Sequence, residues 1–138
     1  MRASQLSWVL ATENRRAVLV VVLWGVSIAS VYAQALLQRS TLTIHDHAAV
    51  FAICLAGGAI MIDFGRALLG YLAASTIGMV LLFTLVTLPM SLGTIPYPGD
   101  ITVTTIWISI IFKAAFPFPF IVYLVASFIG AGIGESYL

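Results

Sequence analysis

The chain has 138 residues, of which 62% are hydrophobic and 8% are charged, and its formal net charge is +1. Soluble domains carry about 25% charged residues, so this composition excludes an ordinary soluble fold and leaves apolar surface for lipid or protein. Six basic residues scattered along the chain form no basic patch, which excludes a nucleic-acid partner. The single cysteine, Cys54, excludes an internal disulfide and a cysteine-based metal site.

Charged residues separate long uncharged runs, and these runs predict an all-α integral membrane protein. We expect a bundle of about four transmembrane helices, with five as an alternative, because a span needs about 20 apolar residues. The whole chain, 1–138, forms one membrane domain in this interpretation. Its expected parts are an N-terminal cytoplasmic or interfacial segment at 1–16 and spans at 17–38, 45–63, 66–92 and 101–134.

The last uncharged run is too long for one straight span, and Pro117 and Pro119 interrupt it within the sequence FPFPF. Proline removes a backbone donor and clashes with the preceding turn of a helix. One interpretation is a single long, kinked helix. The other is two short elements, 101–114 and 119–133, joined by a turn. The first is favoured, because elements of about 15 residues are short for a full span.

The distribution of arginine predicts the orientation of the chain in the membrane. Arg2, Arg15, Arg16 and Arg66 fall on one side if the first three runs span, and Arg39 falls on the other. Basic residues are enriched in cytoplasmic segments. We therefore expect a cytoplasmic N-terminus, with the cell membrane as the location, and a cytoplasmic C-terminus if there are four spans.

Each predicted span carries small residues at positions i, i+4 and i+8, which form a smooth stripe along one face of a helix. Such stripes let two backbones approach closely, and packing drives helix association in lipid. The pattern predicts tight contacts, either within the fold or with other subunits. The stripes are Gly25, Ala29 and Ala33; Ala48, Ala52 and Ala56; Gly70, Ala74 and Gly78; and Ala126, Gly130 and Gly134.

The only cluster of histidine and aspartate is His45-Asp46-His47, just before the second apolar run. In an extended chain, two histidines at i and i+2 lie on one side and suit copper or zinc, with Asp46 as a third ligand. In a helix the two histidines would point apart. The alternative is a polar loop in which Asp46 stabilises the start of a helix.

Lys113 is the one charge that could lie inside the membrane, where an ionisable side chain is a candidate functional residue. The alternative is a lysine that extends to the membrane surface. Possible acidic partners are distant in the sequence: Asp63, Asp100 and Glu135. No carboxylate falls in the middle of a predicted span, which disfavours a proton-coupled exporter.

Catalytic motifs are absent from the sequence, including the glycine-rich phosphate loop, GxSxG and HExxH, so we expect neither a catalytic set nor a cofactor. Small size and a small-residue stripe on every span favour a non-catalytic accessory subunit of a larger membrane complex. Its partners would be lipid and other membrane subunits, or copies of itself. The second hypothesis is a homo-oligomeric transporter or channel that uses the broken last helix and Lys113. The third is an enzyme with a metal at His45 and His47.

Overall fold

The computed structural model describes the chain from Ala3 to Leu138, and its side chains from Glu13 onward. Across these residues the chain forms five helices and no strand: α1 (Ala3–Arg39), α2 (Ile44–Met61), α3 (Phe64–Ser91), α4 (Gly99–Ala115) and α5 (Phe118–Tyr137). Within the described part, α1 from Glu13, α2, α3 and α5 are long and apolar enough to cross a membrane. The prediction of an all-α membrane protein with about four spanning helices is therefore confirmed.

The residues expected to form a separate N-terminal segment continue α1 without a break, so this helix has 37 residues. The part of that expectation that concerns residues 1–2, and the side chains before Glu13, lies outside the described residues. From Glu13 to Arg39 the helix is apolar enough to span, and its polar ends at Arg15, Arg16 and Arg39 are exposed.

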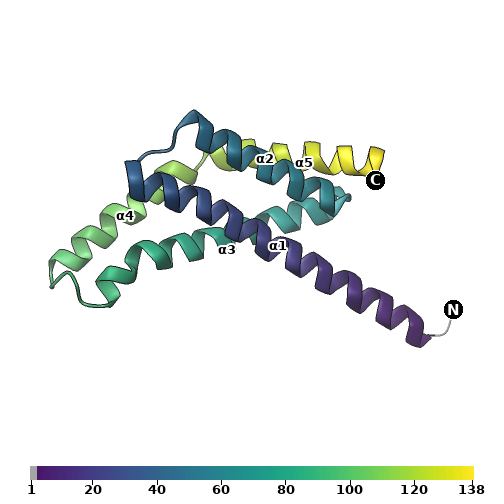
Figure 1. Ribbon diagram of the computed structural model, residues 1–138, viewed down its shortest axis with the longest axis horizontal. Helices are drawn as coiled ribbons and strands as arrows, with labels where there is room; N and C mark the ends of the chain where they lie inside the picture. The colour runs from purple at the N-terminus through teal and green to yellow at the C-terminus, as the bar shows by residue number, and fades with distance from the viewer. Residues whose placement is uncertain (1–2) are drawn as a thin grey trace.

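Carboxylates cap the starts of α2 and α3, which explains where these helices begin. Asp46 accepts hydrogen bonds from the N–H and the hydroxyl of Thr43, at 2.7 and 2.8 Å, and pairs with Arg39 at 2.9 Å. Asp63 accepts from the Arg66 N–H at 3.0 Å. Each carboxylate satisfies donors that have no partner within the helix. Only residues 62–63 separate α2 from α3, and the two helices form an antiparallel hairpin (Figure 1).

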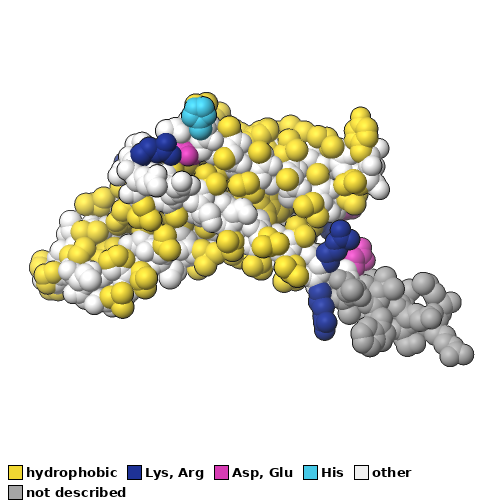
Figure 2. All heavy atoms as spheres, viewed as in Figure 1, with side chains coloured by type: hydrophobic (Ala, Val, Ile, Leu, Met, Phe, Trp, Pro, Cys, Tyr) yellow, Lys and Arg dark blue, Asp and Glu magenta, His cyan; other side chains and the backbone are white. Residues whose placement is uncertain are grey.

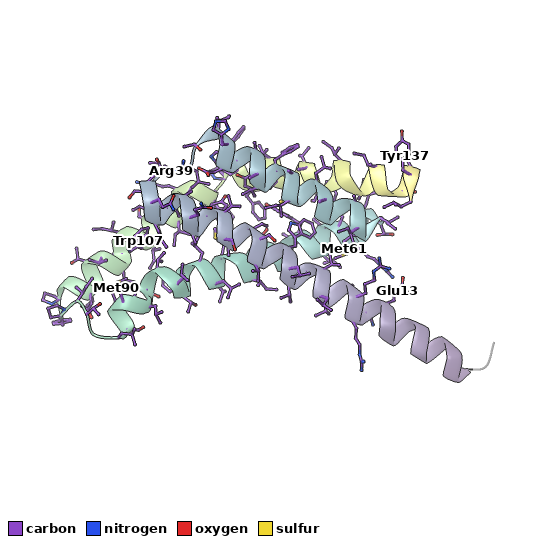
Figure 3. All side chains as sticks on the ribbon, viewed as in Figure 1. Glu13, Arg39, Met61, Met90, Trp107 and Tyr137 are labelled. Atoms are coloured by element: carbon purple, nitrogen blue, oxygen red, sulfur yellow. The ribbon has the colours of Figure 1, made fainter. Side chains whose placement is uncertain are left out.

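The bundle consists of two pairs of parallel helices that are not neighbours in the sequence. In Figure 1, α1 and α3 run in one direction, and α2 and α5 run in the other. Figure 3 shows the same arrangement through the residues at the helix ends. Met61 and Tyr137 lie at one end of the bundle, and Arg39 lies at the other. The C-terminus therefore lies at the end of the bundle where α2 stops and α3 begins.

Glycines bring the backbones of α2 and α5 into direct contact. A Cβ atom on Gly130 would lie 2.0 Å from the carbonyl oxygen of Leu55, and one on Gly134 would lie 2.3 Å from that of Ala59. From the other side, a Cβ atom on Gly58 would lie 1.9 Å from the carbonyl oxygen of Ser127. No side chain fits at these positions, so the glycines set the distance between the two helices.

The contact between α1 and α3 uses the same principle. A Cβ atom on Gly25 would lie 2.8 Å from the carbonyl oxygen of Ala74, and one on Gly78 would lie 3.0 Å from that of Gly25. Among the small residues predicted on α1, α3 and α5, only Ala33 is half-buried. The others are buried: Gly25, Ala29, Gly70, Ala74, Gly78, Ala126, Gly130 and Gly134.

The alanine stripe of α2 differs from the others, because Ala48, Ala52 and Ala56 are exposed. The inner face of α2 instead carries Val50, Cys54, Gly57, Gly58 and Met61. The i+4 pattern therefore marked a face of this helix that points away from the bundle.

The last apolar run is two helices, so the favoured interpretation of one long, kinked helix is wrong. α4 ends at Ala115 and α5 begins at Phe118, with Pro119 in its first turn, where the missing N–H of a proline costs no helical hydrogen bond. α5 has 20 residues, more than the 15 or so expected, because its helix continues past the glycines to Tyr137. Figure 1 shows that the chain bends at this break and does not fold back.

The end of α3 and most of α4 form a hairpin that projects past the α1–α2 turn (Figure 1). We call residues 87–110 the arm. Thr104 donates a hydrogen bond to the Met90 sulfur at 3.1 Å and so joins its two halves, and Figure 3 shows Met90 and Trp107 within it. No residue of the arm is fully buried, although Trp107 and Ile110 pack against the core of the bundle.

A Gly130→Ala substitution tests the glycine contact between α2 and α5. We expect the free energy of unfolding to fall by about 1–3 kcal/mol or more, because the added methyl group would overlap the Leu55 carbonyl. Unfolding in detergent, followed by circular dichroism, measures this change. The matched control is Gly132→Ala on the same helix, whose added Cβ would meet its nearest atom, on Phe64, at 3.7 Å. Equal effects of the two substitutions would contradict the proposed contact.

Candidate functional site

Three buried tyrosines from three helices meet inside the bundle. Tyr32 of α1, Tyr71 of α3 and Tyr123 of α5 are 3%, 1% and 4% exposed. Together with Ser75 they contribute polar groups to the wall of a cavity of about 30 Å³. A water molecule needs about 10–15 Å³ by this measure, so the cavity has room for about two. The cavity therefore brings four polar side chains together in the interior of a largely apolar bundle.

His47 connects this tyrosine cluster to the end of the bundle that carries the α1–α2 turn. Its Nδ1 is hydrogen-bonded to the Tyr123 hydroxyl at 2.5 Å, and the Tyr71 hydroxyl donates to the Phe120 carbonyl at 2.8 Å. His47 is half-buried in the first turn of α2. These bonds connect α2 to α5 and α3 to α5, and they satisfy polar groups that burial would otherwise leave without partners.

Two hollows of different character lie beside His47. The first, of about 360 Å³, has Ser40, Thr41, His47 and Lys113 in its wall, and we call it the polar hollow after them. The rest of its wall is apolar: Leu36, Leu42, Ile110, Ala114 and Pro119. The apolar groove, of about 460 Å³, runs between the starts of α2 and α5. His47 and Pro119 line both, so the two hollows adjoin.

Charged side chains gather in two groups toward opposite ends of the bundle, and hydrophobic side chains lie between these groups and also over the arm (Figure 2). Arg39 and Asp46 form an ion pair at 2.9 Å at one end, and Glu13 and Arg66 form one at 3.1 Å at the other. This distribution is typical of a protein whose charged ends lie at the two surfaces of a bilayer.

The predicted metal ligands His45, Asp46 and His47 lie on the first turns of α2 and not on an extended chain. His45 is exposed, His47 is bonded to Tyr123, and Asp46 is bonded to Thr43 and Arg39. The helix therefore separates the two histidines, and no group of three or more histidine, cysteine or carboxylate residues in the described chain could hold a metal ion. The geometry on which the metal hypothesis depended is not formed.

Lys113 lies in the last turn of α4, where it is exposed and lines the polar hollow. It does not point into the interior of the bundle. Within residues 13–138 it forms no ion pair with its possible partners. Asp63 caps α3, Asp100 lies in the first turn of α4, and Glu135 is exposed near the C-terminus.

Sequence reasoning missed the tyrosine cluster. In the alternative with two short elements, Tyr123 falls near the start of 119–133, where a tyrosine commonly anchors at the membrane surface, yet it is buried. A signal was present, because Tyr32 and Tyr71 fall within apolar runs and a buried tyrosine hydroxyl needs a hydrogen-bond partner. The pattern does not reveal that these residues meet, because this depends on the parallel pairing of the helices.

No protein-family model, curated protein or solved structure matches this chain. Proposals about its function therefore depend on the arrangement of its own residues.

A Tyr123→Phe substitution tests the bond that connects α2 to α5 at His47. We expect it to lower the free energy of unfolding by about 1–3 kcal/mol, because it leaves a half-buried imidazole nitrogen without its partner. Thermal unfolding in detergent measures the change, and Tyr97→Phe at an exposed position is the matched control. In the double variant His47→Phe/Tyr123→Phe, the two effects should not add; full additivity would contradict the bond.

Proposed function

We propose that this protein is a non-catalytic accessory subunit of a larger complex in the cell membrane. The observation that carries the proposal is the arm, residues 87–110, because it presents apolar surface that the chain itself does not cover. The proposed partners are other membrane proteins that pack against this surface.

The arm is apolar on several sides. Its exposed large side chains are Leu88, Leu92, Tyr97, Ile101, Ile106 and Ile108. The buried residues of α4, Ile111 and Ala115, both lie beyond the arm, at the end of the helix that meets the bundle. In a membrane protein such apolar surface is covered by lipid or by another protein.

The position of the arm argues for a protein partner in addition to lipid. The Arg39–Asp46 ion pair marks one charged end of the bundle, and the arm projects beyond the turn that follows Arg39 (Figure 1). If this end lies at a membrane surface, the arm carries its apolar side chains past the hydrocarbon region. A partner that covers the arm would remove this surface from water, which is favourable.

The outward alanine stripe of α2 supports the same proposal. Ala52 and Ala56 are exposed along one face, and such a face allows another helix to approach closely in lipid. Lys113 is exposed, so the transporter hypothesis lacks the support that a buried lysine would give it.

We further propose that both termini lie in the cytoplasm. Arg15, Arg16 and Arg66 lie at the end of the bundle where α5 stops, whereas Arg39 and Lys113 lie at the other. The larger number of basic residues favours the cytoplasmic side for the first end.

Photo-crosslinking in the native membrane tests the proposed interface. A photoreactive amino acid replaces Ile106 in the arm or, as the matched control, Ile121 on the outer face of α5. These isoleucines are 52% and 56% exposed, so they are almost equally accessible and differ mainly in location. We expect Ile106 to yield a crosslink of defined mass to a different protein, and Ile121 to yield none.

Two results would contradict the proposal. One is a crosslink from Ile106 only to a second copy of this chain, which would indicate self-association. The other is equal labelling from the two positions, which would indicate that the arm faces lipid as α5 does.

A further inference from the structure

The polar hollow beside α4 has the chemistry of an anion site at a membrane surface. Lys113 supplies a positive charge, and the side chains of Ser40 and Thr41 supply two hydroxyl groups. The Thr41 hydroxyl also makes a long contact, of 3.5 Å, with the Arg39 carbonyl oxygen. No carboxylate lines this hollow. Asp46, the acid in the adjoining turn, is already bonded to Arg39 and Thr43. The Lys113 ammonium group is therefore available to an anion from outside the chain.

The apolar groove next to it has the chemistry of a site for a hydrocarbon chain. Its walls come from the starts of α2 and α5 and include Ile44, Ala48, Phe51, Phe118 and Val122. The polar atoms that the groove could offer belong to His47 and Tyr123, and these two side chains are bonded to each other. An occupant of the groove therefore meets mainly apolar atoms.

The two hollows form one site for an amphiphile, because His47 and Pro119 line both of them. An occupant with a charged head in the polar hollow could place its tail in the groove without crossing the backbone. The site also lies at the charged end of the bundle, beside the turn between α1 and α2, where lipid headgroups are found.

We propose that this end of the bundle binds an anionic phospholipid, with the phosphate at Lys113, Ser40 and Thr41 and an acyl chain in the groove between α2 and α5. The positive charge of Lys113 favours an anionic headgroup over a zwitterionic one. This inference goes beyond the proposed subunit function and does not depend on it, because the site lies within a single chain.

Native mass spectrometry of the purified protein, in micelles with equal amounts of phosphatidylglycerol and phosphatidylcholine, tests the headgroup. The wild type should retain phosphatidylglycerol in preference to phosphatidylcholine. Lys113→Gln should lower the retained phosphatidylglycerol about fivefold, the size expected for one basic side chain at an anionic lipid surface. Arg15→Gln, which removes an exposed positive charge at the opposite end of the bundle, should leave this preference unchanged.

A pair of adjacent alanines tests the groove. Ala48 lines the groove, whereas Ala49 is exposed and does not line it. Ala48→Phe should fill the groove and lower the retention of both lipids, and Ala49→Phe should not. Since both positions are exposed, neither substitution disturbs the interior, and circular dichroism of each variant verifies the fold.

Three results would each overturn the proposal. The wild type could retain the two lipids equally. Lys113→Gln and Arg15→Gln could lower phosphatidylglycerol binding by the same factor, which would indicate general attraction to charge. Ala48→Phe could behave as Ala49→Phe does, which would show that the groove holds no lipid. Absence of a protein partner in the crosslinking experiment would leave this test unaffected.

Discussion

Carbonyl oxygens of α2 lie against glycines of α5. In the same manner, the Ala74 carbonyl oxygen of α3 lies against Gly25, and the Gly25 carbonyl oxygen of α1 lies against Gly78. In lipid, apolar side chains gain little from moving between helix and solvent, so contact between backbones becomes a main source of helix association. This contact is possible only where side chains are absent. It fixes which helices pair, in which direction and at what depth.

The polar features follow from that pairing. Because α2 and α5 run parallel and in contact, the first turn of α2 lies beside the first turns of α5, and His47 meets Tyr123. The break after Ala115 lets α5 begin at this depth. The same break leaves the end of α4 near the α1–α2 turn, where Lys113 lines the polar hollow. The tyrosine cluster, the polar hollow and the apolar groove are therefore consequences of one packing arrangement.

The sequence predicts the parts of this fold that depend on local chemistry. Uncharged runs identify the spans, because a bilayer excludes charge, and glycines at i+4 spacing indicate close helix contacts. Sequence does not predict the partner of each helix, because the pairs α1–α3 and α2–α5 join segments far apart in the chain. For that reason the pattern of small residues at i, i+4 and i+8 also selected Ala48, Ala52 and Ala56, which are exposed. The burial of Tyr123 depends on the same pairing and was not predicted.

The parallel pairing has a consequence for how the protein is made. Synthesis proceeds from the N-terminus, so α2 enters the membrane long before α5 exists. During that interval Gly57 can meet Trp24 of α1, since its Cβ position lies against that ring, but Gly58 has no partner until Ser127 arrives. The backbone of α2 therefore remains uncovered on one side while the arm is synthesised. Assembly of the bundle is completed by its last helix, and a chain that stops before residue 118 lacks half of its principal contact.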